Sequence, residues 1–79
     1  MNNKTIKLLD TVALRHDLPV RKLRAGEVGT VVELLGNDTY EVEFCDTAGQ
    51  TYAQFALRKD QVILLHNRGK SLKMVLAGA

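Results

Sequence analysis

The sequence predicts an all-β domain, a small antiparallel barrel or sandwich of five strands. Three features support this: residues 39–45 alternate between polar and apolar, turn residues separate short β-branched runs, and Gly26 and Gly29 precede the second run. Alternation with a period of two is typical of a half-buried strand, and glycines let a strand bend as a small barrel requires. We expect strands at residues 10–14, 30–35, 39–45, 50–57 and 61–65.

A long connection follows the first strand. That strand places Val12 and Leu14 on one face, and residues 15–25 then contain the only proline of the chain, Pro19, together with basic residues. Proline and clustered polar residues mark a loop. Three apolar residues of this loop are candidate anchors to the core: Leu18, Val20 and Leu23.

The second and third strands are expected to form a hairpin around the turn-forming residues 36–38, Gly-Asn-Asp. Gly26 and Gly29 permit a positive φ or a bulge where the second strand begins. The strand can therefore bend, and we expect Val28 and Val31 to reach the core.

The third strand is expected to have one buried and one wet face. Its apolar face carries Tyr40, Val42 and Phe44, and its polar, acidic face carries Glu41, Glu43 and Cys45. In the fourth strand Tyr52 and Phe55 fall on opposite faces, so we expect one of them to be exposed. Residues 58–60 are a polar connector of the kind that forms a single helical turn before the fifth strand.

The 79 residues divide into one barrel domain, residues 1–65, and a C-terminal extension, residues 66–79. The extension is first basic and then apolar, a pattern that fits an edge strand, a short helix capped by Ser71 or a disordered segment. Its apolar residues would either pack on the protein's own barrel or pair with another copy, which would make a homo-oligomer. These residues are Leu72, Met74, Val75 and Leu76.

Cysteine content and hydropathy indicate the compartment. Cys45 is the only cysteine, which excludes an internal disulfide and fits a reducing environment. The first residues lack the apolar run of a secretory signal, and no apolar run approaches the roughly 20 residues that cross a bilayer. We therefore expect a cytoplasmic protein that does not act at a membrane.

The net charge of +2 conceals a segregation of charge along the chain. Residues 1–24 carry six bases and two acids (+4), residues 25–57 carry six acids and no base (−6), and residues 58–79 carry five bases and one acid (+4). The basic loop and the basic extension are the predicted partner-binding surface, because loops on a rigid barrel are natural contact sites. Its residues are Arg15, Arg21, Lys22, Arg24, Arg68, Lys70 and Lys73.

Catalytic and metal-binding patterns are absent from the sequence. His16 and Asp17 are adjacent, and neighbours in an extended chain point apart, away from any shared proton-transfer task. Cys45 with His16 and His66 matches no compact zinc-ligand spacing and lacks a fourth ligand. We predict that the protein is not an enzyme and uses no cofactor or metal.

As a set, six segments resemble a family of small bacterial, often cyanobacterial, proteins of unknown function: residues 8–14, 17–19, 26–33, 40–44, 49–53 and 60–61. The resemblance runs from about Leu8 to Leu65. It implies a five-stranded barrel of the Src-homology-3-like type, and it brings no activity, cofactor or catalytic residue. Because members are sometimes encoded beside toxin-like genes, it also implies an accessory or antitoxin-like partner protein.

The Gly-x-x-Gly-x-Val pattern of residues 26–31 is also similar to the KOW element of ribosomal and transcription factors, in which a basic loop and a glycine turn contact RNA or protein. The chain beyond Gly26 is acidic where an RNA-facing strand carries Lys or Arg, and four aromatic residues make no stacking platform. The sequence therefore favours a non-enzymatic protein-interaction module, with a KOW-like nucleic-acid-binding accessory protein as the alternative.

Overall fold

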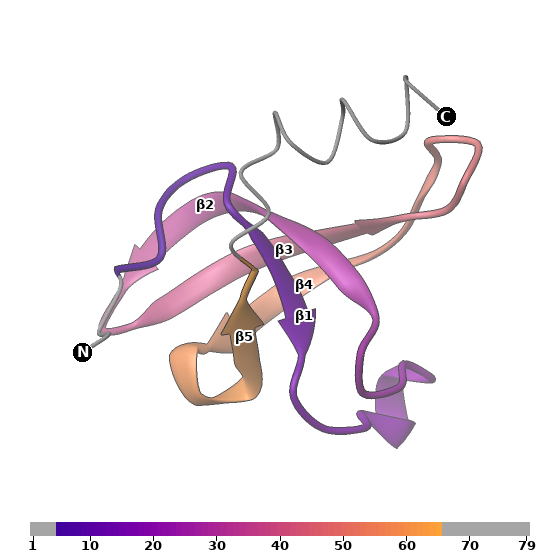
Figure 1. Ribbon diagram of the computed structural model, residues 1–79, viewed down its shortest axis with the longest axis horizontal. Helices are drawn as coiled ribbons and strands as arrows, with labels where there is room; N and C mark the ends of the chain where they lie inside the picture. The colour runs from indigo at the N-terminus through magenta and orange to yellow at the C-terminus, as the bar shows by residue number, and fades with distance from the viewer. Residues whose placement is uncertain (1–4, 66–79) are drawn as a thin grey trace.

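The computed structural model describes residues 5–65, which form one antiparallel sheet in the strand order β4-β3-β2-β1-β5 (Figure 1). The strands are β1 (Thr11–Leu14), β2 (Val28–Gly36), β3 (Thr39–Cys45), β4 (Thr51–Arg58) and β5 (Val62–Leu64). Two short 3₁₀ turns, η1 (Pro19–Arg21) and η2 (Lys59–Gln61), lie in the connections. The predicted all-β class and the five antiparallel strands are confirmed, and the expected helical turn before the last strand is η2.

A tight turn joins β2 to β3 as predicted. Asn37 and Asp38 have positive φ values, 51° and 56°, and Gly36 pairs with Thr39 on either side of them. Two consecutive positive φ values define a type I′ turn, whose twist matches that of the flanking strands. Asparagine and aspartate tolerate this conformation better than most residues, so the local sequence is sufficient to place the hairpin.

The bend of β2 lies later than the sequence suggested. Gly26 has a φ of +92°, but the register shift in the ladder with β3 falls between Val31 and Glu33. Strict alternation therefore holds from residue 28 to residue 31, and the two valines face opposite sides of the sheet. Val31 is buried, whereas Val28 is 49% exposed, so the prediction that both valines reach the core was wrong for Val28.

The core takes residues from every strand of the sheet. Its members are Ile6, Val12, Leu14, Leu23, Val31, Tyr40, Val42, Phe44, Phe55, Leu57 and Val62. The alternation predicted for β3 is confirmed, because its three apolar side chains are buried. Of the loop anchors, Leu23 is buried and Leu18 packs against the core, but Val20 is 94% exposed, so that anchor was wrong.

The sheet does not close into a barrel, which corrects the predicted architecture. β4 and β5 are the two edge strands of the described sheet, and no ladder joins them. The Arg58 N–H at the end of β4 donates instead to Gln61 Oε1 in η2, at 2.9 Å. The chain therefore turns away from the β4 edge, and β5 pairs with β1 through three residues.

The acidic outer face of β3 is present as expected. Glu41 and Glu43 are partly exposed, and Cys45 is an exposed free thiol. Of the two aromatic residues in β4, Phe55 is buried and Tyr52 is half exposed, in agreement with their predicted opposite faces. Within residues 5–65 there is no helix of the length and apolarity needed to cross a membrane. The expectations for residues 66–79 lie outside the described residues.

Candidate functional site

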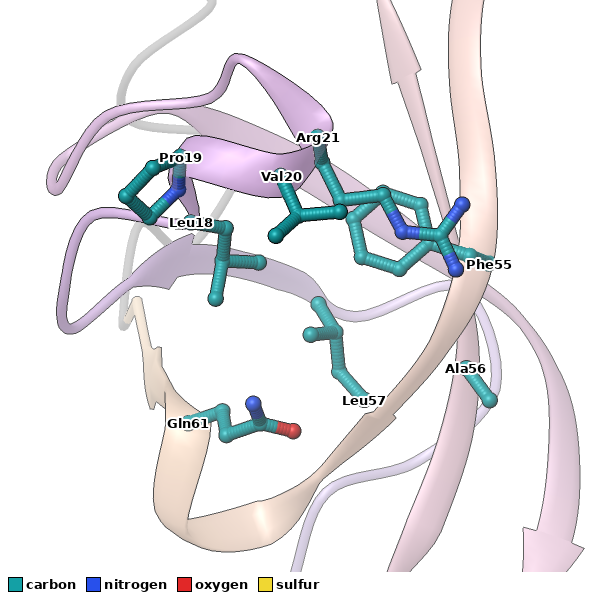
Figure 2. A pocket seen from close by; sticks show the side chains of 8 residues that line it. All are labelled: Leu18, Pro19, Val20, Arg21, Phe55, Ala56, Leu57 and Gln61. Carbon is teal, nitrogen blue, oxygen red and sulfur yellow. The ribbon is translucent and has the colours of Figure 1, made fainter.

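A groove of about 300 Å³ lies between the β1–β2 loop and strand β4 (Figure 2). One wall is the 3₁₀ turn η1 with the residue before it, the other is the second half of β4, and η2 closes one end. This volume is at the lower limit of ligand pockets in proteins, and the groove is open along its length. Its lining residues are Leu18, Pro19, Val20, Arg21, Phe55, Ala56, Leu57 and Gln61.

Local hydrogen bonds fix the loop wall of the groove. Pro19 begins the 3₁₀ turn, where its locked φ is favourable and its missing N–H costs nothing. Leu18 and Leu23 exchange two backbone hydrogen bonds, with N···O distances of 2.8 and 3.2 Å, which close the turn into a small ring. Lys22 ends the turn with a φ of 60°. The exposed side chain of Val20 is therefore held at the rim of the groove by backbone geometry rather than by burial.

Arg21 lies over the aromatic ring of Phe55. Its guanidinium carbon is 4.3 Å from the ring centroid, a distance typical of a cation–π contact. Phe55 is itself fixed in the core, where its ring stacks on Phe44 with centroids 5.8 Å apart. Among residues 5–65 no carboxylate pairs with Arg21. The groove thus holds a positioned cation whose N–H groups are available to a ligand.

Gln61 provides a second set of donors at the other end of the groove. Its Oε1 accepts the Arg58 N–H, and this bond directs its amide nitrogen toward the groove interior (Figure 2). No residue of the described chain accepts a hydrogen bond from that nitrogen. Between Arg21 and Gln61 the walls are apolar, so the groove combines donors at both ends with an apolar centre.

Strand β4 presents an unpaired edge along the groove. In an antiparallel strand the N–H and C=O of one residue point to one side, and those of the next residue point to the other. Arg58 directs its N–H away from β3, to Gln61. Ala56 and Gln54, two and four residues earlier, therefore direct their backbone groups to the same open side, where the described sheet has no further strand.

A carboxylate joins the base of the loop to β4. Glu27 accepts a hydrogen bond from Tyr52 Oη at 2.7 Å and another from the Arg24 N–H at 2.7 Å. These two bonds lower the pKa of Glu27, and the bond from Tyr52 contributes most. The same bond, and to a smaller extent partial burial, raises the pKa of Tyr52 to about 12. The arrangement fixes the end of the loop opposite η1.

The predicted basic surface is divided by the structure. Arg21 lines the groove, but Arg15 donates to the Val62 carbonyl oxygen at 3.3 Å, on the side of β5. Lys22 and Arg24 are exposed and line no part of the groove. Arg68, Lys70 and Lys73 lie outside the described residues. Of the four loop bases, Arg21 is therefore the one that lines the groove.

Sequence reasoning missed the β4 side of the groove. Phe55 and Leu57 were expected only as members of a strand, and Gln61 as the start of another strand. Their approach to η1 is a contact between segments more than thirty residues apart, for which a single sequence carries no local signal. The one available signal was Pro19, which marks the turn that forms the opposite wall of the groove.

The residues considered for chemistry are dispersed. His16 is exposed, as is Cys45 at the far end of β3. In the part of the chain that the structure describes, no three side chains of His, Cys, Asp or Glu come together as metal ligands. His66 lies outside that part.

Fold and groove define a small all-β domain with an open, cationic groove beside the edge of β4 that has no neighbouring strand in the described sheet. The chain belongs to the DUF4926 family, a domain of unknown function, whose model matches residues 8–64. The family match thus covers the whole described sheet and every residue of the groove. No curated protein and no solved structure matches the chain.

Proposed function

We propose that this protein is a non-enzymatic protein-interaction module that holds its partner in the groove between η1 and β4. The observation that carries the proposal is the position of Arg21, stacked on Phe55 at the groove wall with no carboxylate partner among residues 5–65. Arginine and aromatic residues are the side chains that contribute most often to binding energy at protein interfaces.

The chemistry of the lining supports binding rather than catalysis. Among the eight lining residues the polar side chains are those of Arg21 and Gln61, and neither is a nucleophile or a general base near neutral pH. Catalysis of acyl or phosphoryl transfer requires such a group within hydrogen-bond reach of the reacting atom. The groove offers recognition without that group.

We also propose that the sheet is of the Src-homology-3-like type, and the order of the elements supports this. β1, a long loop, three strands joined by tight turns, a 3₁₀ turn and β5 follow in the sequence expected of a Src-homology-3-like domain. We further propose that the protein acts as an accessory or antitoxin-like partner in the bacterial cytoplasm. The single cysteine is consistent with a reducing compartment such as the cytoplasm.

Site-specific crosslinking in the cells that encode the protein tests the proposal. A photoreactive phenylalanine analogue is placed at Val20, which is almost fully exposed at the groove rim, so the fold should tolerate it. The matched control carries the same residue at Glu33, which is exposed on β2. We expect a defined protein adduct from position 20 and none from position 33.

Three outcomes would contradict the proposal. One is the same set of adducts from both positions, and another is no adduct from position 20. The third is an adduct with nucleic acid, which would favour the KOW-like alternative; in that case a gel-shift assay should show binding that weakens steeply as salt rises. If position 20 captures a partner specifically, that partner can be purified and tested for binding. Val20→Asp, which places a carboxylate in the groove, should then abolish its binding.

A further inference from the structure

We propose that the groove binds an extended, acidic segment of a partner protein, which adds to the free edge of β4 as a further strand and pairs a carboxylate with Arg21. This inference rests on the proposed function and specifies the chemistry and the conformation of the ligand. The bound segment would lie between β4 and η1 (Figure 2), with its main chain against Ala56, which lines the groove, and against Gln54, two residues earlier on the same edge of β4. Addition of a strand to an exposed edge is a recurring mode of peptide recognition.

The charge of the groove selects an acidic segment. Arg21 is held over Phe55, so a carboxylate can meet the edge of the guanidinium without first ordering a flexible side chain. None of the eight lining residues carries a carboxylate that would repel it. The nearest acid on η2, Asp60, is already paired with Arg58 at 3.1 Å. Among the lining side chains, the polar groups left free to meet a ligand are therefore the donors of Arg21 and Gln61.

The open edge of β4 determines the conformation. Ala56 and Gln54 each direct one N–H and one C=O away from β3, and alternate residues of an added strand satisfy them. Side chains two positions apart in that strand then lie on the same face as Phe55 and Leu57. We expect an acidic residue opposite Phe55 and Arg21, and an apolar residue two positions away, opposite Leu57.

The groove does not fit the other candidate occupants as well. Polyproline segments bind in grooves lined by several aromatic rings, whereas the ring present here is Phe55, and Arg21 lies over it. The chain's own residues 66–79 contain three Lys or Arg residues and no Asp or Glu, so they lack the charge that Arg21 selects. A partner segment of opposite charge is therefore the occupant that the groove specifies.

Selection from a library of short random peptides, displayed on phage and applied to the full 79-residue chain, tests the acidic preference. We expect enriched sequences with Asp or Glu two positions from an apolar residue. The variant Arg21→Glu should instead enrich Lys or Arg at that position. The unaltered protein and this variant should each bind the peptides selected by the other at least about tenfold more weakly than their own. Lys22→Glu is the matched control, because it makes the same charge change on the neighbouring residue outside the groove and should keep the acidic preference.

Backbone methylation of a selected peptide tests the added strand. N-methyl groups are introduced one amide at a time, each removing a donor and blocking the edge on which it lies. We expect binding to weaken by about tenfold or more at every second position and to change little at the positions between them. Uniform loss, or no loss, would overturn the strand geometry.

The outcomes separate this inference from the proposed function. Loss of binding in Val20→Asp shows that a selected peptide needs the groove. If such peptides lack an acidic residue, or show no alternating response to methylation, the inference is overturned. The proposed interaction module would then still stand. An absence of enriched peptides together with crosslinking from position 20 would do the same, since the partner would not bind as an extended segment. If no peptide is enriched and position 20 yields no adduct, both proposals fail.

Discussion

Gly29 packs against Val42 more closely than any other residue type would permit. A Cβ atom built on Gly29 would lie 2.7 Å from Val42 Cγ1 and 2.9 Å from the Glu43 carbonyl oxygen. Both partners belong to the neighbouring strand β3, and Val42 is fully buried, so neither can move away freely. The close approach explains a glycine within a β-branched run where no positive φ requires one.

Gly29→Ala is expected to destabilise the domain by about 1 to 3 kcal/mol, the usual cost of forcing extra atoms into a well-packed core. Urea unfolding followed by circular dichroism measures the change. Val42→Ala removes the crowded methyl group, so the double variant Gly29→Ala/Val42→Ala should lose less free energy of unfolding than the sum of the two single losses.

Gly26→Ala is the control. Its cost comes from the positive φ of +92° and not from crowding, so its loss of free energy of unfolding should simply add to that of Val42→Ala. Simple additivity for Gly29→Ala would contradict the steric explanation.

The hydrogen bond from Tyr52 to Glu27 should give the domain a defined pH range of stability. The pKa of Glu27 lies below its ordinary value of 4.5, so its contribution is present above that value and is lost as the pH falls through the lowered pKa. The pKa of Tyr52 is raised from 10.0 to about 12, so its contribution is complete below pH 10 and is lost as the pH rises toward 12. Both the acidic and the alkaline limb of the profile of stability against pH therefore depend on the Tyr52–Glu27 hydrogen bond.

Tyr52→Phe should lower the free energy of unfolding at neutral pH by about 1 kcal/mol or less, because the bond is solvent-exposed. The variant should also lose the part of the alkaline decline that Tyr52 causes. Glu27→Gln keeps an oxygen that can accept a hydrogen bond from the Tyr52 hydroxyl, but its side chain does not titrate. This variant should therefore flatten the acidic limb instead. Urea unfolding at a series of pH values measures both profiles. An alkaline limb that is unchanged in Tyr52→Phe would show that another group is responsible.

The strands could be predicted from the sequence because their signals are local. The alternation of residues 39–45 fixes both faces of β3, and Asn37-Asp38 suits the two positive φ values of its turn. Val20 could not be placed by alternation, since η1 is a 3₁₀ turn whose side chains have another period. Barrel closure and the groove could not be predicted either. Both depend on how β4 lies relative to η1 and β1, and these segments are far apart in the sequence, so no local pattern positions them.

Exposure predicts opposite roles for two residues of the groove. Val20 is 94% exposed, so Val20→Asp should change the free energy of unfolding by no more than about 0.5 kcal/mol. Phe55 is 9% exposed and stacks on Phe44, so Phe55→Ala should cost about 3 to 5 kcal/mol. Thermal and urea unfolding measure both changes. A large loss in Val20→Asp would mean that this residue supports the fold, and its use in the binding experiments would then fail.

Amide hydrogen exchange should reveal the open edge of β4 directly. Phe55 and Leu57 direct their N–H groups toward β3 and should be protected, whereas those of Gln54 and Ala56 point away from β3, to the open edge, and should exchange faster by at least about tenfold. Exchange of individual amides by nuclear magnetic resonance, in the unliganded full chain, measures this alternation. Because the same two amides would pair with an added strand, a bound acidic peptide should slow their exchange while leaving Phe55 and Leu57 unchanged. Protection of all four amides in the absence of a ligand would mean that another segment already covers the edge, and the groove would not be free to bind a partner.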